Sequence, residues 1–313
     1  MAEVGIIIVT YNSGKHIGEC LDAALPTGAD IIVVDNASRD DSAAEAARRG
    51  VRVITNFTNA GFAAAVNQGF AVLDCPYILL LNPDAVLQTG LESLREASDL
   101  PGSAGAGGCL TDMYGRPQTG FMVRALPTPA ALILEALVLN RLCPCNSVNR
   151  RYRGLELNYS SRMVVEQPAG AFLMVRRAVW QELGGWDEGF YPIWFEDVDF
   201  CRRVADRGYH LYYEPRAVAK HSGGHSIPEI SVEMSRFYWY RSLLRYSAKH
   251  FRGRAFRAVC LAVVSGSILR AIAESALRRS LKPIAAYGKV VRLAGRCLFF
   301  GWRERAEPYR SGV

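Results

Sequence analysis

Several chemical signatures are missing from this 313-residue sequence, and each absence excludes a class of protein. The eight Cys residues are scattered, and only Cys143 and Cys145 lie close together, at a spacing that matches neither a zinc knuckle nor a redox Cys-x-x-Cys. We therefore expect reduced thiols of a cytosolic protein. We also expect no signal peptide, because the apolar run at residues 4–9 lacks a preceding basic region and a following small-residue cleavage site.

Glycine-rich phosphate cradles are missing as well. Neither Gly-x-Gly-x-x-Gly nor Gly-x-x-x-x-Gly-Lys-Ser/Thr follows the first apolar run, so neither a dinucleotide-binding turn nor a P-loop is supported. The uncharged run at residues 258–269 has 12 residues, whereas a membrane span needs about 20. A sugar-nucleotide pocket without a glycine cradle remains compatible with these absences.

The composition is that of a globular protein with an unusual distribution of charge. Half of the residues are hydrophobic (50%), 21% are charged and the mean hydropathy is +0.04, which predicts one large domain with an appendage. Residues 236–313 hold 17 Lys and Arg against 3 Asp and Glu, whereas residues 1–235 hold 20 against 27. The net charge of +7 therefore comes entirely from the C-terminal part.

Strand and helix patterns alternate in the first hundred residues. This alternation predicts an α/β fold, with a Rossmann-like, mostly parallel sheet, right-handed crossovers and helices on both faces. We expect a fifth strand near residue 109, helices over 130–142, 177–183 and 196–208, and an exposed loop over 150–162. The first four strands are expected at 5–9, 31–34, 51–55 and 77–81.

The fourth of these strands ends in a polar turn. Tyr77 to Leu81 is apolar without alternation, which is typical of a strand buried on both faces, and Asn82-Pro83 stops it. Asp84 is then expected at the carboxyl edge of the sheet, where ligands of open α/β sheets bind. Its carboxylate suits Mg²⁺ or Mn²⁺ that also holds phosphate oxygens, although an ordinary turn explains the same three residues.

The other strand ends also carry polar side chains, which favours a nucleotide pocket over a set of unrelated caps. The residues in question are Tyr11, Asn12, Asp35, Asn36, Asn59, Asn82 and Asp84.

A second acidic cluster opens the helix expected from residue 196. Acids in a first turn are favoured by the helix dipole, and this alone explains many such clusters. The same dipole would keep Asp197 ionised and ready to accept a proton. The aromatic residues that precede it would supply flat walls for a sugar ring, or else belong to the core. They are Trp186, Phe190, Tyr191, Trp194 and Phe195.

Taken together, these motifs resemble the family 2 inverting glycosyltransferases with the A-type nucleotide-sugar fold, and within them the bacterial rhamnosyltransferase group. The resemblance covers roughly residues 4–226. It is carried by the segments 9–12, 34–38, 59–62, 81–84, 170–172 and 195–199.

The resemblance implies a role for each matching residue. Tyr11 and Asp35 would hold the base and ribose, Asn59 and Asn67 would line the donor pocket, and Asp197 would be the catalytic base. The donor side would also include Thr10, Asn12, Asn36, Gly61, Phe62 and Asn82, and the acceptor side Gly170, Ala171, Phe172, Trp194 and Glu196.

One motif departs from the family pattern. The usual Asp-x-Asp appears here as Asn82-Pro83-Asp84, a variant seen in the rhamnosyltransferase-like group. A single carboxylate implies a weaker metal site, which we expect to be completed by the diphosphate, water and His221. His221 and His225 lie in the loop at 220–226, so a plain surface loop is the alternative.

The resemblance implies transfer of a sugar, most plausibly L-rhamnose from dTDP-rhamnose, onto a lipid-linked or polysaccharide acceptor in cell-envelope glycan synthesis. Two alternatives stay open. A sugar nucleotidyltransferase has a similar sheet, but its Gly-rich basic loop is absent here. A non-catalytic sugar-nucleotide or polyprenyl-lipid binding protein would explain the missing first Asp.

The C-terminal segment 229–313 is predicted to be a basic, amphipathic, helical appendage to a catalytic domain of residues 1–228, whose nucleotide-sugar half ends near residue 110. A helix is expected over 229–250, after which basic and apolar residues interleave. We expect it to bind the cytoplasmic face of a bacterial inner membrane as a peripheral protein. A nucleic-acid arm and a helical pair packed on the catalytic domain in a homo-oligomer are the alternatives, of which we disfavour the first.

Overall fold

The computed structural model describes residues 2–223 and 231–303, apart from the side chain of Arg278. The chain forms two compact units. The first comprises 1–126, 153–192 and 196–226, and the second comprises 127–152, 193–195 and 227–313. The C-terminal helices thus share a unit with a segment from the middle of the chain.

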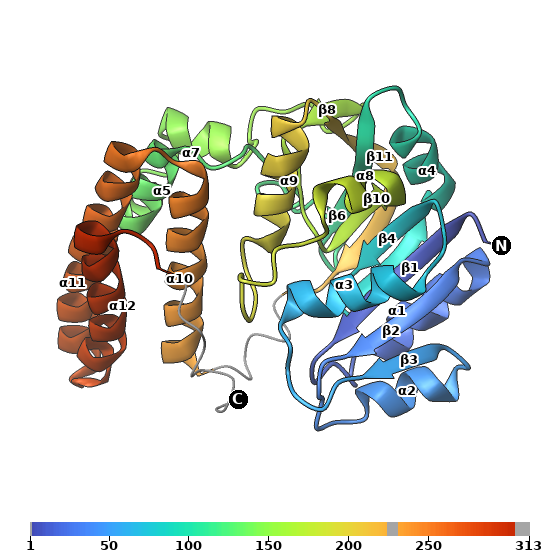
Figure 1. Ribbon diagram of the computed structural model, residues 1–313, viewed down its shortest axis with the longest axis horizontal. Helices are drawn as coiled ribbons and strands as arrows, with labels where there is room; N and C mark the ends of the chain where they lie inside the picture. The colour runs from blue at the N-terminus through green and yellow to red at the C-terminus, as the bar shows by residue number, and fades with distance from the viewer. Residues whose placement is uncertain (1, 224–230, 304–313) are drawn as a thin grey trace. The chain divides into compact units, whose positions relative to one another are not determined.

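The first unit is built on a nine-stranded sheet of order β3-β2-β1-β4-β10-β6-β11-β5, with β8 paired to β11 (Figure 1). The predicted strands are confirmed. The strands are β1 Val4–Thr10, β2 Asp30–Asp35, β3 Arg52–Thr55, β4 Tyr77–Leu81, β5 Ala85–Thr89, β6 Ser103–Thr111, β8 Met163–Val165, β10 Phe172–Arg176 and β11 His210–His221. A separate pair joins β7 Val123–Arg124 to β9 Gln167–Pro168.

Strand direction shows which loops share an edge. Strands β1 to β4 run parallel, β10 runs antiparallel between β4 and β6, and β6 runs parallel to β11. The carboxyl ends of β1, β2, β3, β4, β6 and β11 therefore meet at one edge, together with the start of β10. The α/β fold expected from the sequence is confirmed, and its sheet is mixed because β5, β8 and β10 are antiparallel.

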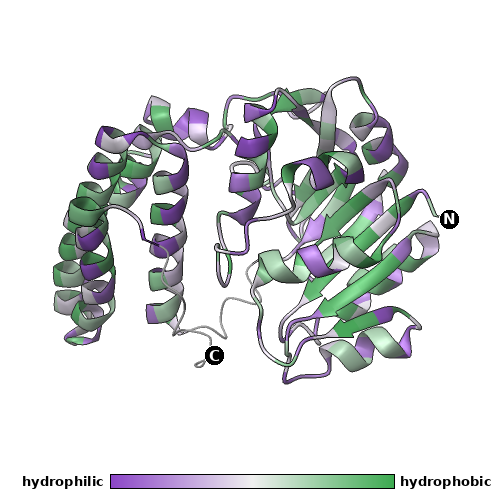
Figure 2. Ribbon diagram, viewed as in Figure 1, coloured by the Kyte–Doolittle hydropathy of each residue, from purple (hydrophilic) through white to green (hydrophobic). Residues whose placement is uncertain are grey.

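Alternating side chains of β1 fill two cores, one on each face of the sheet. Ile6 and Ile8 belong to one cluster and Ile7 and Val9 to the other, so the strand is apolar throughout (Figure 2). Gly69 lets α3 approach closely, since a Cβ there would lie 2.8 Å from Ile7 Cγ2. The surrounding helices are α1 Ile17–Ala24, α2 Ser42–Arg48, α3 Phe62–Val72, α4 Leu91–Ser98, α8 Arg177–Leu183 and α9 Glu196–Asp206.

Two sequence expectations between the strands were wrong. The helix expected over 130–142 is two helices, α5 Pro129–Ala136 and α6 Leu139–Leu142, because Val138 adopts a φ of +66° that ends α5. The loop expected over 150–162 begins inside α7 Ser147–Tyr152.

The second unit contains three long helices, α10 Val232–His250, α11 Gly253–Arg278 and α12 Lys282–Phe300. The expected start of the first helix at Glu229 lies outside the described residues. Helix α11 packs against α12 and α5. It is longer than its uncharged run suggested: the stretch Gly253–Leu277 is long and apolar enough to cross a membrane by length and composition, a test that a soluble protein's core helix also passes.

Candidate active site

The direction of the chain changes between β1 and β4, and the predicted donor residues flank that point. From β1 the chain proceeds to β2 and β3 on one side and then returns to β4 on the other. Ligands of open α/β sheets bind in the crevice that such a reversal leaves at the carboxyl ends of the strands. Ile7 pairs with Leu80, so the carboxyl ends of β1 and β4 lie side by side. The turn that carries Asp84 is therefore next to the end of β1.

Thr10 and Asp35 are linked directly. The Thr10 hydroxyl donates to Oδ1 of Asp35 across 2.8 Å, and the Ser38 amide donates to Oδ2 across 3.1 Å. Asp35 is only 2% exposed. Its carboxylate thus shapes the loop after β2, and contact of Asp35 with a ribose stays a prediction.

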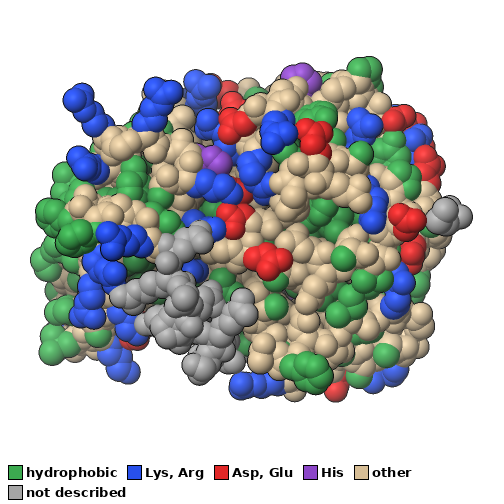
Figure 3. Space-filling view, in the orientation of Figure 1, with side chains coloured by type: hydrophobic (Ala, Val, Ile, Leu, Met, Phe, Trp, Pro, Cys, Tyr) green, Lys and Arg blue, Asp and Glu red, His purple; other side chains and the backbone are tan. Residues whose placement is uncertain are grey.

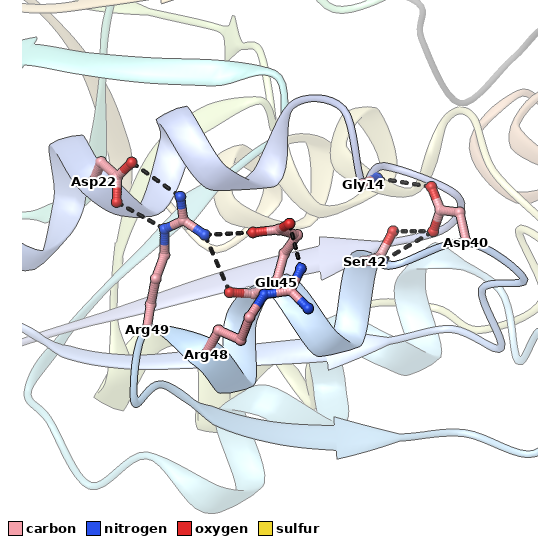
Figure 4. Close-up of polar contacts among 7 residues, drawn as sticks. All are labelled: Gly14, Asp22, Asp40, Ser42, Glu45, Arg48 and Arg49. Carbon is pink, nitrogen blue, oxygen red and sulfur yellow. Dashed lines mark hydrogen bonds and ion pairs between the residues drawn. The ribbon is translucent and has the colours of Figure 1, made fainter.

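Asn12 ties the loop after β1 to the loop after β2. The backbone N–H of Asn12 donates to Ser38 Oγ across 2.9 Å, and its side-chain Oδ1 accepts from the backbone N–H of Arg39 across 2.7 Å. Gly14 extends this contact by donating to Asp40 Oδ2 across 2.8 Å (Figure 4). The two loops are therefore held as one piece, and Tyr11, the first residue after β1, is half-buried.

Asn36 and Asn59 hold each other. Nδ2 of Asn36 donates to Oδ1 of Asn59 across 2.9 Å, and Oδ1 of Asn36 accepts from the Ala60 amide across 2.8 Å. Gly61 has a φ of +89°, and a Cβ there would lie 2.9 Å from the Tyr191 ring. These contacts fix the segment that leads into α3 at the same edge of the sheet.

Asn67 serves the segment before the acidic helix. Its Oδ1 accepts from the Trp186 amide and its Nδ2 donates to the Trp186 carbonyl, both across 3.0 Å. Trp186 is buried and lies 5.7 Å from the ring of Phe62. Trp186 and the fully buried Phe190 therefore belong to the hydrophobic core, the alternative to a wall for a sugar ring.

Trp194 belongs to the second unit with Phe195. Both residues have positive φ angles, +81° and +70°. The ring of Phe195 is buried and packs against Trp239 and Tyr246 of α10, while Trp194 is half-buried. The acceptor role of Trp194 stays a prediction.

Asp84 and His221, predicted as a metal pair, lie together. His221 ends β11, and its Nε2 is 3.5 Å from Oδ1 of Asp84. Oδ2 of Asp84 accepts from the Gly223 amide across 2.9 Å. Among the described residues no group of three or more His, Cys, Asp or Glu side chains is placed to hold a metal, and His225 is outside them.

Gln118 orients the His221 ring, a role that no sequence motif indicated. Its Nε2 donates to the His221 carbonyl across 2.7 Å, which leaves Oε1 facing Nδ1 at 3.0 Å. An amide oxygen accepts only, so Nδ1 carries a proton. In neutral imidazole the lone pair of Nε2 then faces the Asp84 carboxylate, and two such acceptors favour a cation between them.

Asp197 is held by the segment that leads into β10. Its Oδ2 accepts from the Gly170 amide across 3.1 Å and from Gln167 Nε2 across 3.3 Å, and its Oδ1 accepts from the Val198 amide across 2.8 Å. Burial raises the pKa of Asp197, although the Gly170 and Val198 amides and the charge of Arg124 act in the opposite direction. Burial is the largest of these effects, and the raised pKa makes the ionised Asp197 a stronger base. That the helix dipole keeps Asp197 ionised stays a prediction.

Glu196 is the more deeply buried neighbour. It is 4% exposed, and its Oε2 accepts no hydrogen bond from the described residues. Burial, and then the charge of Asp197, hold the pKa of Glu196 well above its ordinary value. Glu196 is therefore a neutral acid at pH values where an exposed Glu is ionised.

The two acidic groups belong to one edge of the sheet. Phe172 pairs with Leu81, and the Asn82 amide donates to the Ala171 carbonyl across 3.0 Å. Gly170, which holds Asp197, is thus one residue away from the contact of β10 with the Asn82-Pro83-Asp84 turn. The sequence placed Asp84, Gly170 and Asp197 at one site, and the hydrogen bonds connect their segments.

Residues 5–152 match the family model described as glycosyl transferase family 2. The chain carries a family 2 glycosyltransferase domain. This glycosyltransferase is 28% identical over 240 residues to the N-acetylglucosaminyl-diphospho-decaprenol L-rhamnosyltransferase of Mycobacterium tuberculosis, covering 71% of this chain and 76% of that protein. It is 27% identical over 195 residues to the rhamnosyltransferase WbbL of Escherichia coli, covering 59% and 67%.

Solved structures confirm the A-type fold of this glycosyltransferase. The mannosyltransferase PcManGT of Pyrobaculum calidifontis, in complex with GDP-Man and Mn²⁺, superimposes with a TM-score of 0.54 at 15% identity, covering 96% of this chain and 87% of that one. GalNAc-T7, with UDP, GalNAc and Mn²⁺, gives 0.52 at 14% identity, covering 80% and 50%. At these identities the likeness concerns the fold alone.

Proposed function

We propose that this glycosyltransferase inverts the anomeric centre of its donor, with Asp197 as the base. The oxygen of an acceptor hydroxyl would attack the anomeric carbon while its proton passes to Asp197, and the bond to the nucleoside diphosphate would break. The hydrogen bond from the Gly170 amide to Asp197 carries the proposal, because it fixes this carboxylate at the ligand edge of the sheet. Oδ1 accepts one hydrogen bond and Oδ2 two, so Oδ1 has the greater capacity for the proton.

A divalent cation would be held by Asp84 and His221. One carboxylate and one imidazole suit Mg²⁺ or Mn²⁺ that takes its remaining ligands from a diphosphate and water, rather than from a closed protein cage. When bound, such an ion offsets the negative charge that grows on the leaving diphosphate. The Gln118 contact, which turns Nε2 of His221 toward Asp84, supports this assignment, as do the Mn²⁺ complexes of proteins with the same fold.

The donor we propose is dTDP-L-rhamnose and the acceptor a lipid-linked sugar, such as a polyprenyl diphosphate N-acetylglucosamine of cell-envelope glycan synthesis. Support comes from the relatives, one of which is named as acting on an N-acetylglucosaminyl-diphospho-decaprenol and both as rhamnosyltransferases. A family 2 domain favours glycosyl transfer over nucleotidyl transfer.

A comparison of Asp197→Asn with the wild type tests the base. We expect transfer to fall by about three orders of magnitude, since a positioned base contributes about 10²–10⁴-fold, while a thermal-shift titration with the donor is unchanged. Equal transfer by both proteins would remove Asp197 from the mechanism.

A panel of dTDP, UDP and GDP sugars, with and without Mn²⁺, tests the donor. We expect dTDP-rhamnose with Mn²⁺ to raise the melting temperature most, because a ligand that binds only the native state stabilises it. A larger rise in melting temperature with UDP-glucose would show that dTDP-rhamnose is not the preferred donor.

The single carboxylate at Asp84 keeps the non-catalytic binding protein as a second candidate. Ligand-induced shifts in melting temperature without transfer of any sugar would favour it.

A further inference from the structure

The outer face of α11 is apolar over most of its length. Four large side chains are exposed at steps of one, three and seven residues, and Ile272 among them is 62% exposed. They are Leu261, Ile268, Leu269 and Ile272, and the exposed Leu277 follows near the end of the helix. Between residues 258 and 277, a length of about 30 Å, only Arg270 and Glu274 carry charge.

Both of those charged side chains are used inside the second unit. Arg270 donates through Nη2 to the carbonyl oxygens of Glu135 (3.0 Å) and Ala136 (3.2 Å) in α5. Glu274 pairs with Arg236 of α10 at 2.8 Å and accepts from the Tyr287 hydroxyl of α12 at 2.8 Å. Between residues 258 and 277 the outer face of α11 is therefore an uncharged surface, and large exposed apolar patches mark interaction sites.

Helix α12 adds positive charge. Lys289, Arg292 and Arg296 are exposed at steps of three and four residues, and Ile284 and Phe299 are exposed on the same helix. Figure 3 shows hydrophobic side chains with Lys and Arg beside them over α11 and α12. Apart from Glu274, neither helix contains an Asp or Glu.

We propose that the outer faces of α11 and α12 bind the surface of an anionic lipid bilayer. Leu, Ile and Phe side chains would enter the boundary of the acyl region while Lys and Arg contact the headgroups. The charge decides between a bilayer and a second copy of this chain, because two copies would bring identical cationic faces together with no exposed carboxylate on either helix to offset them. An anionic surface supplies that complement.

The contacts of α11 place it in the plane of the bilayer rather than across it. Of its most apolar window, 44% is buried within the protein. Helices α5, α10 and α12 cover the other face through the ion pair and hydrogen bonds of Arg270 and Glu274. A spanning helix would need those polar groups to lie in hydrocarbon.

Flotation of the full chain with vesicles tests the proposal. We expect binding to vesicles of equal parts phosphatidylglycerol and phosphatidylcholine, and weak binding to phosphatidylcholine alone. Ile272→Glu should lower the partition coefficient about tenfold or more, because an Ile that would enter the bilayer is replaced by a charge. The control Val164→Glu, at a β-branched residue 55% exposed in β8, should bind as the wild type does.

The charge is tested separately with Arg292→Gln and Arg296→Gln, which leave the apolar face intact. Each should weaken binding about fivefold at low salt. Alkaline carbonate should release the bound protein. The proposal would be overturned if the wild type did not bind anionic vesicles. It would also be overturned by a concentration-dependent dimer that Ile272→Glu dissociates, or by retention of the protein on vesicles in carbonate. Vesicle binding needs neither donor nor acceptor, so it stands or falls independently of the transferase reaction.

Discussion

The amide of Gly170 lies 3.1 Å from Oδ2 of Asp197, and a larger residue at that position would press on its neighbours. A Cβ at 170 would lie 3.1 Å from the Asp197 Cβ and 3.2 Å from the Trp186 ring. We expect Gly170→Ala to displace the carboxylate and to lower kcat about tenfold or more, with little change in donor affinity. Steady-state kinetics alongside donor thermal shift measure the two effects.

The matched control is Gly288→Ala in α12, where a Cβ meets nothing within 4 Å. Ala is favoured over Gly in a helix, so this variant should gain up to about 1 kcal/mol of stability and keep its kcat. A kcat for Gly170→Ala equal to that of Gly288→Ala would show that the Gly170 contact does not position Asp197.

Glu196 should make stability depend on pH. Burial raises its pKa well above the ordinary 4.5, so between 4.5 and that raised value the unfolded chain is ionised while the folded protein keeps the proton. This stabilising contribution is complete below pH 4.5 and is lost as pH rises through the folded-state pKa. Glu196→Gln should therefore melt about 2 °C or more above the wild type at neutral pH.

Melting temperatures of both proteins measured from pH 4 to pH 8 test that linkage. The two curves should converge on acidification, since both residues are then neutral. A constant offset across the range would mean that Glu196 ionises normally in the folded protein.

Gln118 should control metal affinity without contacting the metal. Gln118→Ala releases the His221 ring, and loss of such an orienting partner weakens metal binding about 10–100-fold. Calorimetric titration of Mn²⁺ in the presence of dTDP measures it. Gln88→Ala, at a Gln whose side-chain amide donates to the carbonyl oxygens of Val86 and Leu87, should match the wild type. Identical Mn²⁺ affinities of the two variants would show that His221 does not bind the metal.

Asn67 should matter for stability more than for donor binding. Both atoms of its amide satisfy the main chain of Trp186, so Asn67→Ala leaves two polar groups without those partners and should cost about 1–3 kcal/mol. Urea unfolding measures this. The control is Asn158→Ala, at an exposed residue whose side chain accepts from the nearby Ser160, which should stay within about 0.5 kcal/mol of the wild type. Equal stability of the two variants would show that Asn67 has no such structural role and would favour its predicted role in the donor pocket.

The pattern of the chain was sufficient to predict most of the parallel strands and the residues at their ends. The apolar run 77–81 followed by Asn82-Pro83 is a local signal, because burial on both faces and the proline act on adjacent residues. The break at Val138 had no such signal, since a β-branched residue rarely adopts a positive φ.

The sequence by itself determined the first four parallel strands, the polar residues at their carboxyl ends, and the concentration of positive charge in the C-terminal part. Only the tertiary structure decided that β10 runs antiparallel beside β4, that Gln118 holds His221, and that burial raises the pKa of Asp197. The reason is range. Strand pattern and turn chemistry act between neighbouring residues, whereas hydrogen-bond partners and desolvation depend on segments about 30 to 100 residues away, which folding alone brings together.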